Sequence, residues 1–224
     1  MNARVGIITF PGTNCEQDCE RAFAALGGAP VRVWHGDTTL PDVDVVVLPG
    51  GFAHGDYLRT GALARFSPIM DAVRAHADAG GTVIGICNGF QVLCEAGMLP
   101  GALRKNAGLK FRCKWVELKV ENASTRFTSR AGAGQILRIP INHFEGNYYC
   151  DEDTLETMRA DGRVILRYVQ NPNGSLDDIA GICNSSGTVF GLMPHPERAC
   201  EALLGSIDGA VIFESILDNA RVSA

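Results

Sequence analysis

The alternation of apolar runs with helical segments over the first hundred residues is the feature that most constrains the fold. The continuous apolar run at 45–48 is typical of a strand buried on both faces of a parallel sheet. A segment with helical spacing follows Cys15, and Ser67-Pro68 is expected to cap and begin another helix before the strand at 82–86. Parallel strands joined by helices use right-handed crossovers. The alternation therefore predicts a doubly wound sheet with helices on both faces.

The second half has a different pattern. Strand-like segments separated by turn clusters indicate antiparallel hairpins, with one helix among them and one or two more at the C-terminal end. The expected strands are 111–120, 136–141, 164–169, 179–183 and 188–192, and the expected helices are 154–160 and 197–219. We therefore expect an α/β, flavodoxin-like, mostly parallel sheet with an antiparallel hairpin extension.

Length and composition bound the function. A chain of 224 residues can bury a full core, and no linker interrupts it, so we expect a single domain over 1–224. With 20 Lys and Arg against 25 Asp and Glu, no global positive field favours nucleic acid. The apolar run at 5–10 is too short for a signal segment, and no membrane span is expected, which predicts a cytoplasmic protein.

The cysteines are expected to be reduced thiols. None of the 8 forms a C-x-x-C pair, and a chain of this size does not need disulfides. Cys15 and Cys19 lie four apart on an expected helix face, but no His or further Cys follows at zinc-finger spacing. We therefore expect no metal site.

The strongest local signal for chemistry is Gly85-Ile86-Cys87-Asn88-Gly89. It follows a buried strand and precedes a helical segment, which is the context of a nucleophile elbow with Cys in place of Ser. The flanking glycines leave room for a strained turn, and the helix N-terminus is expected to lower the pKa of the thiol. The alternative is a structural Cys buried between two packing glycines.

A cysteine nucleophile needs a base, and His195 is the candidate, within Pro194-His195-Pro196-Glu197 after a strand. The flanking prolines predict a stiff, extended backbone in which Glu197 lies on the same side as His195 and orients the imidazole. These residues complete a predicted Cys-His-Glu triad. A solitary histidine without a catalytic role is the alternative.

A Gly-Gly turn after the strand at 45–48 supplies the third element. The backbone N–H groups of Gly51 and Asn88 are expected to donate to the anion that develops during acyl transfer. Open α/β sheets bind their ligands at the carboxyl ends of strands, where this turn lies. An ordinary strand-to-helix turn would have the same sequence.

Taken together, these motifs resemble the class I glutamine amidotransferases. The segment 85–91 resembles that family's nucleophile motif, 195–197 its base and orienting carboxylate, and 49–51 its oxyanion loop, in the same order. The segments 10–15 and 50–61 resemble one branch of the family, the glutaminase subunits of purine biosynthesis. The resemblance extends from Val5 to about Asn219 without a departure at the triad.

The resemblance implies hydrolysis of L-glutamine through a Cys thioester, with ammonia passed to a large synthetase subunit. That partner would use ATP and Mg²⁺ to convert formylglycinamide ribonucleotide to its amidine, and this chain would bind no cofactor. Gly50, Gln91 and His143 are implied to contact glutamine, although a solvated turn at 142–146 is an equal alternative. The need for a small third subunit and the roles of His54 and Glu145 stay open.

Two other functions were compared with this one. A stress-type hydrolase or deglycase of the same fold usually carries His directly after the Cys, where this sequence has Asn88. A catalytically inactive regulator would not need a complete set of triad residues. Both alternatives are therefore less well supported than the glutaminase.

Overall fold

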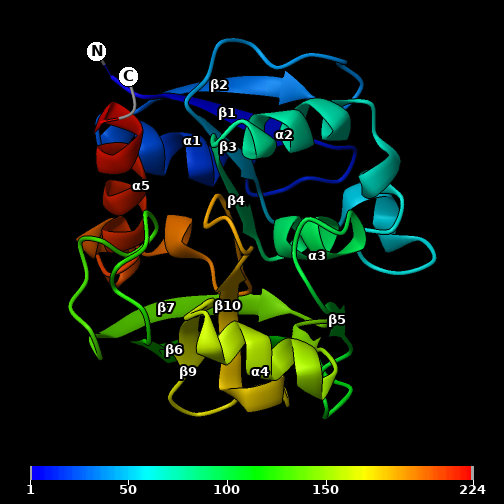
Figure 1. The fold of residues 1–224 in the computed structure, drawn as a ribbon, viewed down its shortest axis with the longest axis vertical. Coiled ribbons are helices and arrows are strands. Elements are labelled where there is room, and N and C mark those ends of the chain that lie inside the picture. Colours follow the sequence, from blue (N-terminus) through cyan, green and yellow to red (C-terminus); the bar gives the residue numbers. More distant parts are fainter. Residues whose placement is uncertain (1, 223–224) are drawn as a thin grey trace.

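The computed structural model describes residues 2–222, and one mixed sheet of nine strands runs through them (Figure 1). The strand order is β2-β1-β3-β4-β11-β10-β9-β6-β7, and a separate small sheet pairs β5 with β8. The bounds are β1 (Arg4–Thr9), β2 (Ala29–Trp34), β3 (Val45–Leu48), β4 (Thr82–Ile86), β5 (Ala102–Arg104), β6 (Arg112–Val120), β7 (Ile136–His143), β8 (Asn147–Tyr149), β9 (Val164–Tyr168), β10 (Ile179–Cys183) and β11 (Val189–Leu192).

The first five strands in this order pair in parallel, as the sequence predicts for β1 to β4, whereas β11 was expected only as part of the antiparallel hairpins. Every residue of β3, β4 and β11 is buried, which explains their apolar composition. The chain runs from β1 outward to β2 and from β3 inward to β4, so the direction of the crossovers reverses between β1 and β3. Such a switch point is where open α/β sheets bind ligands.

The helices cover both faces of the parallel strands, which confirms the predicted fold class (Figure 1). On one side α1 (Glu16–Ala25) packs on α5 (Ala210–Val222), with Phe23 and Phe213 stacked at 4.4 Å between ring centroids. On the other side lie α2 (Ile69–Asp78) and α3 (Asn88–Glu95). None of the described helices has the length and apolarity needed to cross a membrane.

The hairpin extension also exists. Strands β11, β10, β9, β6 and β7 pair antiparallel in that order, and α4 (Glu152–Ala160) precedes β9. The 197–219 region contains short 3₁₀ turns before α5, so the expected helix there begins only at Ala210.

One predicted cap is wrong. Ser67 does not cap α2, since Pro68 is the N-cap and makes no side-chain cap hydrogen bond. The Ser67 hydroxyl instead shares a hydrogen bond of 3.1 Å with His35 Nδ1, because tertiary packing brings that ring to the start of the helix. A cap prediction considers only local partners and misses this competition.

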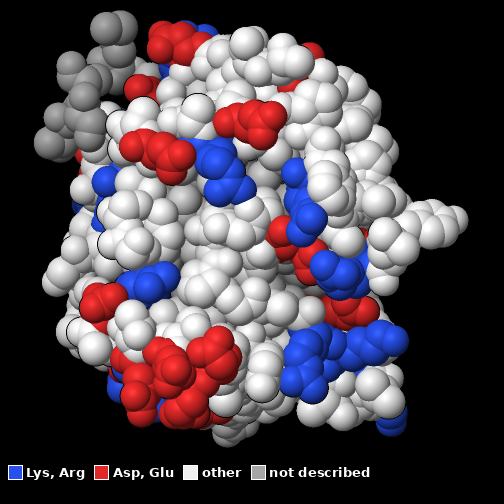
Figure 2. Space-filling view, turned by 45° about the vertical axis from the view of Figure 1, so that its right-hand side comes forward, with Lys and Arg blue, Asp and Glu red and all other residues white. Residues whose placement is uncertain are grey.

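Figure 2 shows charged groups of both signs on this face, with acidic groups gathered at the lower left and basic groups at the lower right. The catalytic candidates Cys87, His195 and Glu197 are buried. The segments of the candidate site follow the carboxyl ends of β1, β3, β4 and β11, which meet at one edge of the sheet. The fold therefore brings four distant segments of the chain to one place.

Candidate active site

Cys87 stands at a sharp turn between β4 and α3. Its backbone has φ 51° and ψ −102°, a left-handed region that is costly for a residue with a side chain. A Cβ on Gly89 would overlap the carbonyl oxygen of Leu48, and one on Gly85 would lie 2.5 Å from Leu93 Cδ1. The structure thus contains the strained, glycine-flanked turn that the sequence predicts for an elbow.

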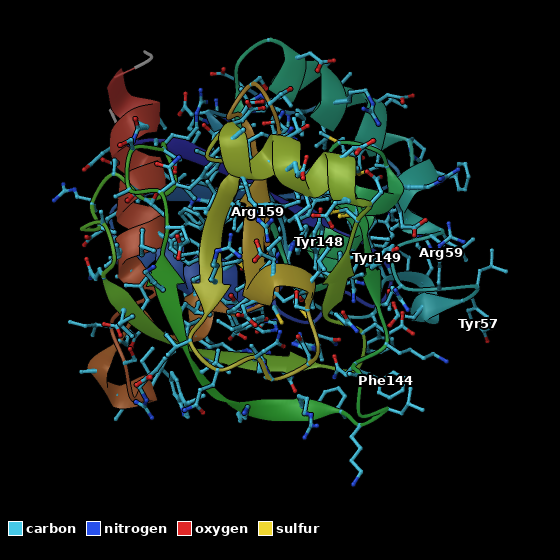
Figure 3. All side chains as sticks on the ribbon, turned by 60° about the horizontal axis from the view of Figure 1, so that its bottom comes forward. Tyr57, Arg59, Phe144, Tyr148, Tyr149 and Arg159 are labelled. Carbon is cyan, nitrogen blue, oxygen red and sulfur yellow. The ribbon has the colours of Figure 1, made fainter. Side chains whose placement is uncertain are left out.

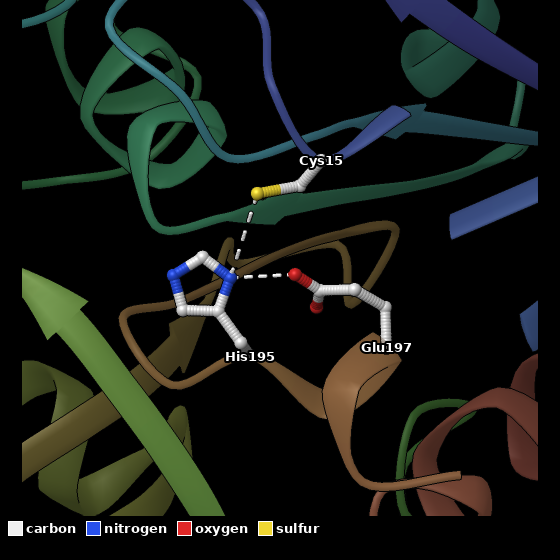
Figure 4. A group of neighbouring side chains, drawn as sticks. All are labelled: Cys15, His195 and Glu197. Carbon is white, nitrogen blue, oxygen red and sulfur yellow. Dashed lines mark hydrogen bonds and ion pairs between the residues drawn. The ribbon is translucent and has the colours of Figure 1, made fainter. Parts of the chain in front are cut away.

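His195 and Glu197 form a buried pair after β11. His195 Nδ1 lies 2.5 Å from Glu197 Oε1, and the side chains are 2% and 0% exposed (Figure 4). The predicted extended backbone is wrong here, because 196–198 forms a 3₁₀ turn. This turn, closed by the N–H of Arg198 donating to His195 O (3.2 Å), brings the carboxylate back onto the ring.

The electrostatics of the pair favour a protonated imidazole. Burial is the largest single influence on His195 and opposes a charge, but the Glu197 carboxylate, Cys87 and Cys15 together outweigh it, so the pKa of His195 lies well above its usual value. The Nδ1 atom of His195 is hydrogen-bonded to Glu197. The buried Nε2 has no hydrogen-bond partner among the described residues, which leaves it available for proton exchange with Cys87 and a ligand.

The two backbone N–H groups that the sequence predicts to hold an oxyanion have no acceptor among the described residues. Neither Gly51 nor Asn88 donates its N–H within the described part of the chain. Gly51 is held by the bonds of its neighbours, since the N–H of Phe52 donates to Gly12 O (3.0 Å) and that of Asn14 to Gly50 O (3.1 Å). The structure therefore places unpaired donors at both predicted positions.

The side chain of Asn88 connects the elbow to the 52–60 loop. Its Oδ1 accepts from the N–H of Ala53 (3.0 Å), and its Nδ2 donates to Gln91 Oε1 (2.9 Å) and to Asp56 Oδ1 (3.5 Å). Gln91 Nε2 in turn donates to the carbonyl oxygen of Glu145 (2.5 Å). Three segments of the site, the start of α3, the 52–60 loop and the turn after β7, are thus joined by one polar network.

Cys15 is the site residue that sequence analysis missed. It is the N-cap residue of α1 rather than part of the helix face expected with Cys19, and its buried Sγ lies 4.0 Å from His195 Nδ1 (Figure 4). Arg198 Nη2 donates to the same sulfur at 3.1 Å. A Cys 180 positions from the His gives no local signal for this contact.

Among the described residues, one group of side chains has the spacing of a metal site, and it is this cluster around Cys15. The ligand atoms of Cys15, His195 and Glu197 lie within 4.8 Å of one another. The guanidinium of Arg198 beside the sulfur opposes a cation there. All eight cysteines are free thiols.

A cavity of about 350 Å³ opens onto these groups. Its walls include Cys87, His195, Gly51, Gln91 and His143, and further lining residues are Asn14, Cys15, Phe52, Asp56, Thr60, Phe111, Asn142, Phe144, Glu145 and Arg198. Gly50 does not line it. A Cβ there would lie 2.7 Å from His195 Cε1, so this glycine permits close approach of the loop to the base.

His143 is buried, which excludes a solvated turn at this residue. Asn106 Oδ1 accepts from its Nδ1 (3.1 Å), because Asn106 Nδ2 already donates to the carbonyl oxygens of Lys110 and His143. Burial, and then the charge of His195, lower the pKa of His143 to about 3. The ring is therefore neutral, with a free acceptor at Nε2. His54 packs against Phe10 and does not line the cavity.

Comparison with known proteins agrees with this geometry. The model of the CobB/CobQ-like glutamine amidotransferase domain matches residues 2–210. The chain is 52% identical over 219 residues to the phosphoribosylformylglycinamidine synthase subunit PurQ of Rubrobacter xylanophilus, covering 98% of this chain and 100% of that protein.

Solved structures give the same result. A chain of the PurLQS structure from Thermotoga maritima superposes with a TM-score of 0.91 at 46% identity, covering 98% of this chain and 99% of that one. A glutamine amidotransferase from the same organism, 16% identical with a TM-score of 0.59 over 99% of this chain and 93% of that one, shares the fold. The chain therefore belongs to the PurQ family of phosphoribosylformylglycinamidine synthase subunits, within the CobB/CobQ-like glutamine amidotransferases.

Proposed function

We propose that this chain hydrolyses L-glutamine to glutamate and ammonia and delivers the ammonia to a synthetase that makes formylglycinamidine ribonucleotide in purine biosynthesis. Cys87 is the nucleophile, His195 the proton carrier and Glu197 its orienting carboxylate. One observation carries the proposal: a cysteine strained to φ 51° shares a cavity with a buried His-Glu pair at 2.5 Å. We also propose that 1–224 is one domain, although residues 1, 223 and 224 lie outside the described part.

The first half-reaction forms a thioester. The Cys87 thiolate attacks the carboxamide carbon, and the carbonyl oxygen becomes an anion that accepts from the N–H groups of Gly51 and Asn88. The C–N bond then breaks as protonated His195 gives its proton to the leaving nitrogen, which departs as ammonia. The raised pKa of His195 supports this order, because the imidazole carries the proton before the attack.

The second half-reaction releases glutamate. His195, now neutral, takes a proton from water, and the resulting hydroxide attacks the thioester carbon. The C–S bond breaks, Cys87 leaves as a thiolate, and His195 is protonated again. Glu197 keeps its hydrogen bond at Nδ1 throughout, so that Nε2 remains the nitrogen that exchanges the proton.

The partner is proposed from the relatives. The similar Thermotoga maritima chain comes from a structure of PurLQS, so we propose a large synthetase subunit and a small third subunit here too. In this proposal the synthetase binds ATP and Mg²⁺, this chain binds neither, and the complex is cytoplasmic.

Exposed apolar groups around the cavity mouth support such docking. Phe52, Phe111 and Phe144 are exposed and line the cavity, and Tyr57 and Leu58 on the 52–60 loop are 73% and 86% exposed. Figure 3 shows Tyr57 and Arg59 projecting outward from their loop. Large exposed apolar groups grouped around a site mark contact surfaces.

Covalent labelling tests the chemistry. The glutamine analogue 6-diazo-5-oxo-L-norleucine should label Cys87 alone, and peptide mapping of all eight cysteines checks this. Cys87→Ser should abolish glutamine-dependent synthesis by the complex but keep ammonium-dependent synthesis. Cys113→Ser is the matched control, since this exposed thiol does not line the cavity and should not be needed for labelling. Labelling of Cys15 with Cys87 untouched would contradict the proposal.

A further inference from the structure

One side of the cavity carries two carboxylates that the proposed mechanism does not use. Asp56 belongs to the 52–60 loop, and Glu145 follows β7, yet both line the cavity that contains Cys87. We call Asp56 and Glu145 the acidic pair. Two carboxylates alone do not identify a ligand. The groups around them in the cavity indicate what kind of ligand fits.

Asp56 is held in place by strain and by a tether. Its φ of 55° is one of three positive values for non-glycine residues in 54–58, and its Oδ1 lies 3.5 Å from Asn88 Nδ2. Partial burial, and then the charge of Glu145, raise the pKa of Asp56 to about 6. The free carboxylate is therefore held at an energetic cost that a bound cation would offset.

Glu145 is positioned from two sides. The Thr60 hydroxyl donates to its Oε2 at 2.9 Å, and Gln91 Nε2 donates to its carbonyl oxygen. Gln91 is bonded to Asn88, which also tethers Asp56. The amide pair Asn88–Gln91 thus connects both members of the acidic pair to the first turn of α3, directly after the nucleophile.

An independent observation points to a ligand with N–H donors. His143 lines the same cavity and is 3% exposed, and its Nε2 has no partner among the described residues. Because Asn106 holds the proton on Nδ1, Nε2 can only accept. The cavity therefore offers acceptors from Asp56, Glu145 and His143.

No cationic side chain among the described residues bonds to these acceptors. Arg198 is the one Lys or Arg among the lining residues, and it bonds to Cys15 and Asp18. Arg59, on the same loop as Asp56, pairs with Glu95 at 2.6 Å. The cation that fits has to come with the ligand.

We propose that Asp56 and Glu145 form the binding site for the α-ammonium group of glutamine, with His143 Nε2 as a further acceptor for a substrate N–H. This inference rests on the proposed function. It assigns specificity for an amino acid, rather than for a simple amide, to residues outside the triad. The hydrogen bonds of the Asn88–Gln91 pair fix the position of this site relative to the elbow.

Binding to an inactive complex tests the site directly. In a Cys87→Ser background with the synthetase present, affinity is measured for L-glutamine and for glutaramate, which lacks only the α-amino group. Asp56→Asn should weaken L-glutamine by about tenfold or more and glutaramate by less than about twofold, since only the first forms a charge-assisted bond. Glu145→Gln should act in the same way. Asp71→Asn, an exposed site on α2, is the matched control.

Asp56→Asn and Glu145→Gln keep the size and shape of the side chains they replace. Asn at 56 keeps an oxygen for Asn88 Nδ2, so the tether survives and only the charge is lost. Equal weakening of both ligands by Asp56→Asn, or no weakening of L-glutamine, would overturn the site. Kinetics give a second readout: KM for L-glutamine should rise with kcat within about twofold. Failure of the wild-type complex to hydrolyse glutamine would instead overturn the proposed function.

Discussion

The elbow around Cys87 and the 52–60 loop, which the Asn88 side chain joins, differ in how they are built. The elbow is buried, and its glycines are required by atoms at overlap distance. The loop is exposed at Tyr57 and Leu58 and is held by a few polar bonds from Ala53, Asp56 and Thr60. The comparison shows that the reacting groups stand at buried strand ends, whereas Asp56 and the exposed apolar residues stand on a loop with few supporting contacts.

The largest effect should come from the strand-end groups. His195→Ala should lower glutamine-dependent kcat by about a thousandfold or more, because it removes the proton carrier, and Glu197→Ala should cost less because it removes only orientation and charge support. Glutamate release by the complex measures both. Ammonium-dependent synthesis is the control and should be unchanged. A fully active Glu197→Ala would reduce the triad to a dyad.

Glycine replacement compares the two regions directly. Gly89→Ala should destabilise the fold by about 2–3 kcal/mol, because its Cβ has to displace backbone of β3. Gly55→Ala in the loop, where the Cβ meets only the Tyr57 ring at 3.2 Å, should cost about 1 kcal/mol from its positive φ. Urea unfolding measures both. Equal costs would contradict the distinction between the closely packed elbow and the loosely packed loop.

Docking should act through the loop. Glutaminase turnover of the isolated chain should rise by about tenfold or more when the synthetase and its nucleotide substrates are added. Leu58→Asn should reduce this stimulation, since Asn tolerates the positive φ at 58 but removes the apolar contact. Leu203→Asn, 93% exposed and outside the cavity wall, is the control. Equal turnover with and without the partner would favour an independent hydrolase.

The smallest effect concerns pH. A raised pKa means that Asp56 takes up a proton as the pH falls through about 6, so glutamine should bind about fourfold more weakly at pH 5.5 than at pH 7.5. Glu145 faces the same group, while His143 stays neutral and Arg59 is paired with Glu95. Affinity measured in the Cys87→Ser background checks this. The dependence should disappear in Asp56→Asn, and its persistence there would assign it to another group.

The same pKa has a consequence for stability. Because the folded value lies above the unfolded one, the carboxylate form of Asp56 disfavours folding above about pH 6, and this penalty is relieved as the pH falls. Asp56→Asn should therefore raise Tm more at pH 7.5 than at pH 4.5. A shift of equal size at both pH values would show that the charge is not responsible.

The sequence predicted the elbow and the sheet but not all of the site's geometry. Gly85, Cys87 and Gly89 are close in sequence, so the steric requirement is readable locally. The prediction of an extended backbone around His195 was wrong. The two flanking prolines restrict φ, but they do not exclude a 3₁₀ turn. Cys15 was missed because its contacts with His195 and Arg198 join positions 180 or more apart.

What the sequence determined by itself were features that depend on spacing: apolar runs for buried parallel strands, glycines at a sharp turn, and the presence of a thiol, an imidazole and a carboxylate. What only the tertiary structure decided was which groups share an environment. The protonation of His195, the acceptor state of His143 and the raised pKa of Asp56 all arise from burial and from charges on other segments. Electrostatic energies depend on distance and desolvation in space, and separation along the chain contains neither.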